Sequence, residues 1–120
     1  MNKLFSYTAI PCEDFERAFA FYNHITNGML ARNPHVPFPM AYFTDKDGNN
    51  VGHLFQLPPF RPAGDGAVVY MEPADIDTML AQIEKAGGKT IMPKTPLGPG
   101  KGHWAVFLDS EGNKLALHTK

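Results

Sequence analysis

The sequence has almost no cysteine and no long hydrophobic run. Its single cysteine, Cys12, cannot form an internal disulfide, so folding does not require an oxidising compartment. No run of ~20 apolar residues is present to span a bilayer. Acidic Glu13 and Asp14 follow the first apolar run before a signal-peptide core could form. These features predict a cytoplasmic protein that has no membrane partner.

Basic residues are scattered along the chain and never form a cluster. The 120 residues include 11 Lys+Arg and 12 Asp+Glu, which gives a formal net charge of −1. A nucleic-acid-binding protein needs a basic patch to contact phosphates, so we expect no nucleic-acid partner. With 43% hydrophobic and 12% aromatic residues, the composition is typical of a globular domain that can form one core without metal or disulfide staples.

An internal repeat organises the chain. In each half, a strand-like apolar run leads to an acidic residue, Asp14 or Asp75, that begins an amphipathic helix. A short carboxylate suits the N-cap because it accepts the free N–H groups of the first helical turn. Each half also contains a polar hairpin turn, at residues 45–49 and 109–113. The two halves are therefore predicted to fold alike.

The pattern predicts an α+β fold built from two βαβββ modules. A single domain over 1–120 would comprise module one at 1–57, a Pro- and Gly-rich linker at 58–66 and module two at 67–120. Predicted strands lie near 4–10, 29–32, 40–45 and 51–57 in module one and near 66–72, 89–92, 103–109 and 113–119 in module two, with helices near 14–26 and 75–86.

Three segments carry a resemblance to a known family. The stretch Asp-Phe-Glu-Arg-Ala-Phe-Ala-Phe-Tyr at 14–22 and the closing Phe-Leu-Asp-Ser-Glu-Gly-Asn-Lys-Leu-Ala-Leu at 107–117 resemble the vicinal oxygen chelate superfamily of glyoxalases, bleomycin-resistance proteins and extradiol dioxygenases. Residues 86–98 look like its uncharacterised glyoxalase-like branch. The resemblance implies two curved sheets paired around a cavity, and a homodimer.

The resemblance also implies where a divalent metal would be held. The first-strand ligand positions map to Tyr7 and Val68, the last-strand position of module two maps to Ala116, and that of module one maps to either Gly52 or Gln56. Val, Ala and Gly have no side-chain donor, and neutral Tyr and Gln are weak ligands. We therefore expect no metal at the usual positions and no cofactor.

Strand alternation extends the prediction in module one. Successive side chains of a strand point to opposite faces. If Tyr7 faces the cavity and the fourth strand follows either mapping, then Gly52, Leu54 and Gln56 face inward, and His53 faces the helix.

The same argument predicts a second group of inward residues in module two. If Val68 faces inward, so does Tyr70, and if Ala116 faces inward, so does His118. Trp104 follows the loop at 94–102 and offers a stacking surface or a lid anchor. The candidate ligand-binding residues are Tyr7, Leu54, Gln56, Tyr70, Trp104 and His118.

His103 and His118 lie near the open end of one predicted hairpin, where a relocated metal or proton-transfer site could form. They share a face if they pair directly, and they face opposite sides if the register slips by one residue. The sequence leaves both alternatives open.

The favoured function is binding of a small, largely apolar organic molecule in the cavity without the usual metal. One alternative is a metal-dependent glyoxalase-like lyase, isomerase or dioxygenase with relocated ligands such as His103 and His118. Another is a non-catalytic interaction subunit whose cavity is filled by its own aromatic rings. The sequence does not name a ligand or a catalytic residue.

Overall fold

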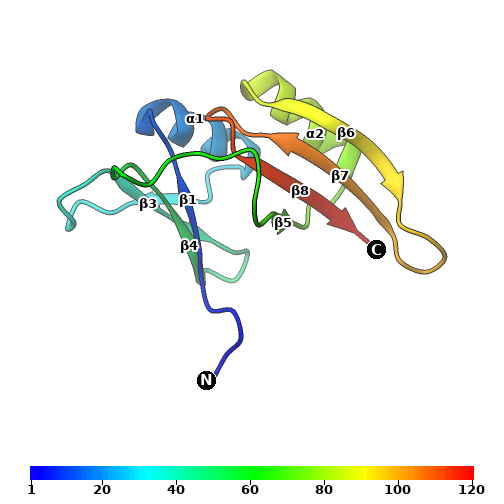
Figure 1. The fold of residues 1–120 in the computed structure, drawn as a ribbon, viewed down its shortest axis with the longest axis horizontal. Coiled ribbons are helices and arrows are strands. Elements are labelled where there is room, and N and C mark those ends of the chain that lie inside the picture. The colour runs from blue at the N-terminus through cyan, green and yellow to red at the C-terminus, as the bar shows by residue number, and fades with distance from the viewer. The chain divides into compact units, whose positions relative to one another are not determined.

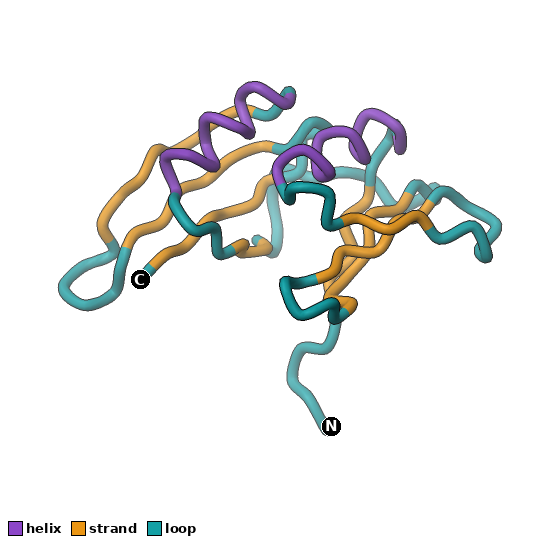
Figure 2. The backbone as a smooth tube through the Cα atoms, turned by 180° about the vertical axis from the view of Figure 1, so that it is seen from behind, coloured by secondary structure: helices purple, strands orange, loops and turns teal.

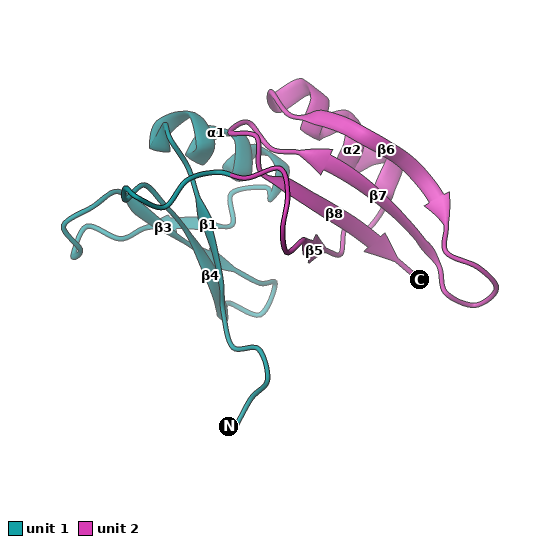
Figure 3. Cartoon of the chain, viewed as in Figure 1, with its two compact units in different colours: residues 1–62 teal, residues 63–120 magenta.

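Each half of the chain folds as one strand, one helix and three further strands in a computed structural model that describes all 120 residues (Figure 1). Unit 1 comprises residues 1–62 and unit 2 comprises residues 63–120 (Figure 3). The elements of unit 1 are β1 (Thr8–Pro11), α1 (Phe15–Ile25), β2 (Leu30–Arg32), β3 (Met40–Thr44) and β4 (Asn50–Phe55). Those of unit 2 are β5 (Val69–Met71), α2 (Ile76–Ala86), β6 (Lys89–Pro96), β7 (His103–Leu108) and β8 (Lys114–Thr119).

The two sheets have the same topology. Their strand orders are β1-β4-β3-β2 and β5-β8-β7-β6, and in each sheet the first strand runs parallel to the last while the other pairs are antiparallel. Figure 2 shows a helix running along one side of the sheet in each unit. The predicted α+β fold of two βαβββ modules is confirmed.

Both helices begin at the predicted acidic residue. Asp14 Oδ1 accepts a hydrogen bond from Arg17 N at 3.1 Å, and Asp75 Oδ2 accepts one from Thr78 N at 2.8 Å. These bonds satisfy amide groups that the first helical turn leaves without partners. Neither helix has the length or the apolar stretch needed to cross a bilayer.

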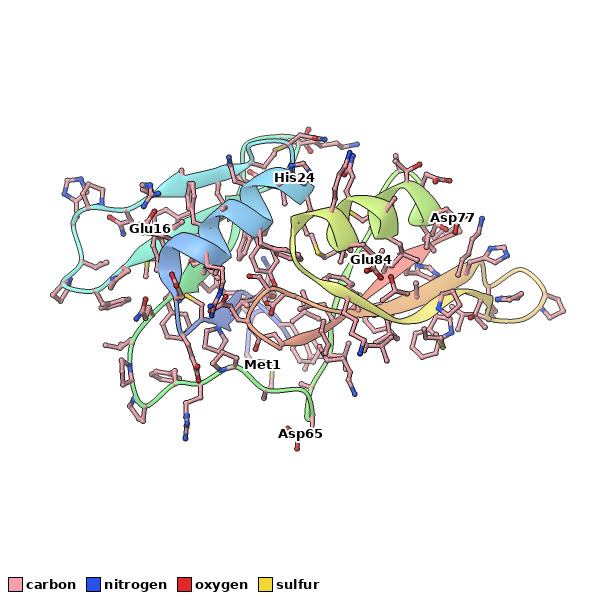
Figure 4. All side chains as sticks on the ribbon, turned by 90° about the horizontal axis from the view of Figure 1, so that it is seen from above. Met1, Glu16, His24, Asp65, Asp77 and Glu84 are labelled. Atoms are coloured by element: carbon pink, nitrogen blue, oxygen red, sulfur yellow. The ribbon has the colours of Figure 1, made fainter.

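The core of unit 1 lies between α1 and one face of its sheet. The ring of Tyr22, on the helix, packs edge-to-face on Phe43 of β3 with centroids 5.2 Å apart. On the same face, the guanidinium of Arg32 on β2 forms an ion pair with Glu16 Oε1 at 2.7 Å, and Glu16 lies in the first turn of α1. Figure 4 labels Glu16 and His24 toward the two ends of this helix. Other side chains of this core, all buried, are Ile10, Phe21, Ile25, Ala41 and Leu54.

The core of unit 2 follows the same plan. Ile76, Leu80 and Ile83 of α2 are buried, and the sheet contributes buried side chains at alternate positions of β7 and β8. These sheet residues are Ala105, Phe107, Leu115 and Leu117. Leu115 pairs with Phe107 and Leu117 with Ala105, so these four buried side chains share one face of the sheet.

A β-bulge distinguishes the two sheets. In unit 1, Phe43 pairs with Gly52 whereas Thr44 pairs with Asn50, so Val51 is an extra residue in β4. The corresponding pairing of β7 with β8 runs from Leu108 with Lys114 to His103 with Thr119 without a shift. Residues of β4 after Val51 are therefore displaced by one position from their counterparts in β8.

Element boundaries differ most from the prediction in two places. The first strand was predicted from residue 4 but begins at Thr8, and the second strand of module two was predicted to end at 92 but extends to Pro96. Two register shifts interrupt its pairing with β7. The extension includes Pro93 and Pro96, and β6 is an edge strand, where proline is tolerated.

Gly52 is required where β4 passes β1. A Cβ at this position would collide with the carbonyl oxygen of Thr8. We therefore expect Gly52→Ala to lower the free energy of unfolding by about 1–3 kcal/mol, measured by urea denaturation.

Gly64→Ala is the matched control, because the nearest atom to its added Cβ is Gly112 O at 3.7 Å, an ordinary contact. The control should change the free energy by less than about 0.5 kcal/mol. Equal stability of the two variants would show that Thr8 and Gly52 do not approach as described.

Candidate functional site

The bulge at Val51 decides which residues of β4 face away from α1. Ala9 of β1 and Tyr42 of β3 both pair with His53, so these three side chains lie on one face. Gly52 and Leu54 lie on the opposite face, against the helix, where Leu54 is 0% exposed. We call the face that carries Ala9, Tyr42 and His53 the helix-free face of unit 1.

A tyrosine–histidine pair lies on the helix-free face. The hydroxyl of Tyr7 is 2.9 Å from Nδ1 of His53, and the two rings meet edge-to-face with centroids 5.1 Å apart. Tyr7 stands immediately before β1 and remains 44% exposed. The pair joins the entry of the first strand to the middle of the fourth strand.

Further aromatic rings extend from this pair. His53 packs edge-to-face on Phe55 at 4.9 Å, and Phe55 in turn contacts Phe60 at 5.2 Å and Phe38 at 6.4 Å between centroids. Phe38 comes from the segment between β2 and β3, and Phe60 from the segment after β4. The aromatic rings of this cluster therefore come from strands and from two flanking segments.

Tyr42 adds a second hydroxyl beside the pair. Its oxygen accepts a hydrogen bond from Asn33 Nδ2 at 2.9 Å, which holds the phenol in place. Because Tyr42 pairs directly with His53 across the sheet, their side chains are neighbours on the same face.

Partial burial shifts two pKa values at this site. Burial lowers the pKa of His53 below its ordinary value, because the cationic imidazolium loses hydration and no charged group compensates. Burial is also the main reason why the pKa of Tyr7 is raised, with the Asn50 side chain acting in the opposite direction. A neutral imidazole is therefore favoured at neutral pH.

Three of the residues predicted to face inward, Gly52, Leu54 and Gln56, lie on the helix side of the sheet instead. Leu54 is in the core beneath α1, and the side chain of Gln56 turns to the helix, where its Oε1 accepts a hydrogen bond from Phe15 N at 2.9 Å. The prediction that they share the face of Tyr7 is wrong, and so is the prediction that His53 faces the helix. The physical reason is the extra residue Val51, since a one-residue slip moves every later side chain to the other face.

The helix-free face of unit 2 brings together the remaining candidates. Tyr70 of β5 and Trp104 of β7 stack with ring planes 12° apart and centroids at 6.3 Å. Trp104 pairs with His118, and Tyr70 pairs with Ala116, so all four lie on one face. Tyr70 is 54% exposed, which leaves the outer side of this stack accessible.

The two histidines of the β7–β8 hairpin do not form a joint site. His103 pairs with Thr119, one position away from His118, so their side chains point to opposite faces. His118 Nε2 instead lies 3.1 Å from the carbonyl oxygen of Lys101 and must donate, because a carbonyl only accepts. An open hollow of about 580 Å³ beside it is lined by Leu97, Gly100, Lys101, His118 and Lys120.

The family of the chain follows from a comparison with family models. The model of the Glyoxalase/Bleomycin resistance protein/Dioxygenase superfamily matches residues 4–117. The chain belongs to this superfamily. A curated relative, a glyoxylase-like domain-containing protein from Didymella fabae, is 27% identical over 119 residues, which cover 92% of this chain and 89% of the relative.

Solved structures share the superfamily fold. The fosfomycin resistance protein FosX from Listeria monocytogenes has a TM-score of 0.72 at 16% identity, and the match covers 100% of this chain and 95% of the FosX chain. A hypothetical protein from S. aureus has a TM-score of 0.71 at 17% identity, covering 95% of both chains. A glyoxalase I mutant from Zea mays has a TM-score of 0.71 at 18% identity, with 96% of this chain but 44% of that one. Such identities show the fold alone.

The positions that the resemblance assigns to a metal carry few strong ligands in this chain. Ala9 and Tyr70 are equivalent, because each stands the same number of residues before its helix cap. Ala9 pairs with His53 and Tyr70 pairs with Ala116. The counterpart of Ala116 is therefore His53, rather than Gly52 or Gln56. The remaining first-strand positions are Tyr7 and Val68. Valine and alanine offer no donor and neutral Tyr7 is a weak ligand, so His53 is the single strong ligand at these positions. One strong ligand is fewer than the three protein ligands of a catalytic zinc site, so these residues do not fit a divalent ion, and neither unit gathers three or more His, Cys, Asp or Glu side chains.

Sequence reasoning missed His53, Tyr42 and Asn33 as components of the site. A signal for His53 was present, because a glycine inside a strand pattern, here Gly52, often marks a bulge. Tyr42 and Asn33 carry no comparable local signal, since their roles depend on pairing between strands that are separated in sequence.

His53 makes stability depend on pH in a defined direction. Because its pKa is lower in the folded protein, the unfolded chain binds the proton first as pH falls. This contribution is complete above the ordinary histidine pKa, and it is lost as the pH falls from that value through the lowered pKa of the folded protein. The groups that face the ring are Tyr7, Tyr42 and Phe55, none of which carries a charge in this range.

We therefore expect His53→Gln to flatten the fall in unfolding free energy between about pH 7 and pH 5, measured by urea denaturation at several pH values. His35→Gln, at an exposed position, is the control and should keep the wild-type slope. Parallel slopes for wild type and His53→Gln would contradict the lowered pKa.

Proposed function

We propose that the protein binds a small, largely apolar organic molecule, held by aromatic side chains and oriented by Tyr7 and His53, without the metal that is usual in the superfamily. The observation that supports this is the helix-free face of unit 1, where rings surround one neutral hydrogen-bonded pair. Binding sites for organic molecules commonly combine apolar and aromatic walls with a few fixed polar groups.

The helix-free face of unit 2 supports the same function independently. Tyr70 and Trp104 offer parallel ring surfaces on which a planar molecule can stack, and His118 stands beside Trp104 across the strand pair. These three residues remain our candidates for ligand contact in unit 2. Tyr7 and His53 are the candidates in unit 1, with Leu54 and Gln56 withdrawn because they face the helix.

The family name does not choose among functions, since it joins two enzyme classes with resistance proteins. The poor donor set favours binding without a divalent ion over metal-dependent chemistry. The opposite orientation of His103 and His118 removes the pair on which a relocated site depended. A homodimer and a cytoplasmic location remain predictions from the sequence.

The metal-free part of the proposal has a direct test. Protein purified without an affinity tag and without added metal should contain far less than one equivalent of zinc, nickel, iron or manganese by elemental mass spectrometry. A chelator should leave the melting temperature unchanged, because no metal contributes to the folded state. A near-stoichiometric metal, with a chelator-induced fall in melting temperature that the same ion restores, would overturn this part.

Ligand binding is tested by a fragment screen using amide chemical shifts of the full chain. We expect aromatic fragments to shift the amides of β1 and β4 around Tyr7 and His53. His53→Ala should weaken the best fragment by about tenfold or more, the effect of one lost hydrogen bond together with ring contact. His35→Ala should retain wild-type affinity because His35 is exposed in the segment before β3. A screen without hits on either sheet face would contradict the proposed function.

A further inference from the structure

Two asparagines flanking the helix-free face of unit 1 are held in a fixed orientation. Asn50 Oδ1 accepts a hydrogen bond from Gly52 N at 3.1 Å, and Asn33 Oδ1 accepts one from His35 N at 3.0 Å. Each amide oxygen is therefore committed to the backbone. The NH2 end of each side chain, which only donates, is left for the face.

Asn33 Nδ2 donates to the hydroxyl of Tyr42 at 2.9 Å. The Asn50 side chain lowers the pKa of the Tyr7 hydroxyl, which is the effect of a hydrogen-bond donor on a phenol oxygen. A phenol that receives a hydrogen bond still has one proton to donate, and the proton of Tyr7 has an acceptor in His53 Nδ1 at 2.9 Å. An imidazole nitrogen is also a better acceptor than a phenol oxygen, which favours the same direction.

The direction of these bonds sets the tautomer of His53. When Nδ1 accepts from Tyr7, the neutral ring carries its hydrogen on Nε2. Nε2 has no hydrogen-bond partner, and no buried side-chain nitrogen or oxygen of the protein lacks one, so Nε2 is accessible to solvent. The hydrogen bond that holds Tyr42 uses its oxygen as acceptor, which leaves its O–H proton available as well.

We infer that this face is a donor site for a neutral carbonyl oxygen, which accepts hydrogen bonds from His53 Nε2–H and Tyr42 O–H while the rest of the ligand packs on the aromatic rings. A carbonyl oxygen has two lone pairs, which matches two donors on directly paired residues. The inference rests on the proposed binding function and adds the chemical class of the ligand, an apolar ketone, aldehyde or amide.

The absence of charge at the face argues for a neutral ligand. No ion pair involves the residues of this face, and burial alone, without a charged neighbour, accounts for the lowered pKa of His53. A carboxylate would lose hydration here without gaining a cationic partner. A hydrogen bond between neutral groups carries no such cost.

The tautomer is measured first, in the free full-length protein, by long-range ¹H–¹⁵N correlation of the histidine ring near pH 7.5. We expect Nε2 to be protonated and Nδ1 to be an unprotonated acceptor. Tyr7→Phe should release Nδ1 and give a mixture of both tautomers, whereas His24→Phe, on the exposed side of α1, should leave the His53 signals unchanged.

Ligand class is then measured with three probes of similar size. Acetophenone has a neutral carbonyl, cumene has the same shape without an acceptor, and benzoate has a charged acceptor. We expect wild type to bind acetophenone about tenfold or more tightly than either cumene or benzoate, by chemical-shift titration. His53→Phe and Tyr42→Phe should each reduce this preference, and His24→Phe should preserve it.

Each outcome has a separate meaning. A His53 ring protonated on Nδ1 would overturn the donor site, whatever binds. The expected tautomer with equal affinity for acetophenone and cumene would overturn the carbonyl assignment but leave apolar binding intact. The expected tautomer with no binding of any probe or screened fragment would show that the binding function itself fails, and the ligand assignment with it.

Discussion

One extra residue in a strand decides which side chains stand on the helix-free face of unit 1. Val51 forms a β-bulge in β4, and the side chains that follow it are exchanged between the two faces of the sheet. Without the bulge, Gly52 and Leu54 would lie on the helix-free face, and His53 would be pressed against α1. With it, an imidazole stands beside Tyr7, and a leucine completes the core. The polar pair and the packed interior thus depend on the same local irregularity.

The fold was predictable from the sequence because its signals are local and occur twice. Asp14 and Asp75 mark helix starts by hydrogen bonds within one turn, and the turns at 45–49 and 109–113 close hairpins between neighbouring strands. Such features need only a few adjacent residues. Agreement between the two copies then fixed the order of the elements.

The site was only partly predictable because it depends on register between distant segments. Tyr70 and His118 lie on one face, as strand alternation predicted, because β5, β8 and β7 pair without a shift. In unit 1 the same reasoning failed for Leu54 and Gln56, because the alternation of side chains along one strand does not reveal a register shift against its neighbour. A hydrogen bond such as that between residues 7 and 53 joins positions 46 apart, and its existence follows from the folded sheet alone.

The two hairpin turns, alike in backbone hydrogen bonding, have different neighbours. In unit 2, Asp109 is 4% exposed and Asn113 is 8% exposed, and Asn113 Oδ1 also accepts a hydrogen bond from Ala63 N at 3.0 Å. The equivalent Asn49 of unit 1 is exposed. The turn at 109–113 thus also anchors the segment that enters unit 2 at Ala63. Such a turn has less freedom to vary in length. The first turn is thus the place where this scaffold can accept inserted peptide, while the second fixes the point at which unit 2 begins.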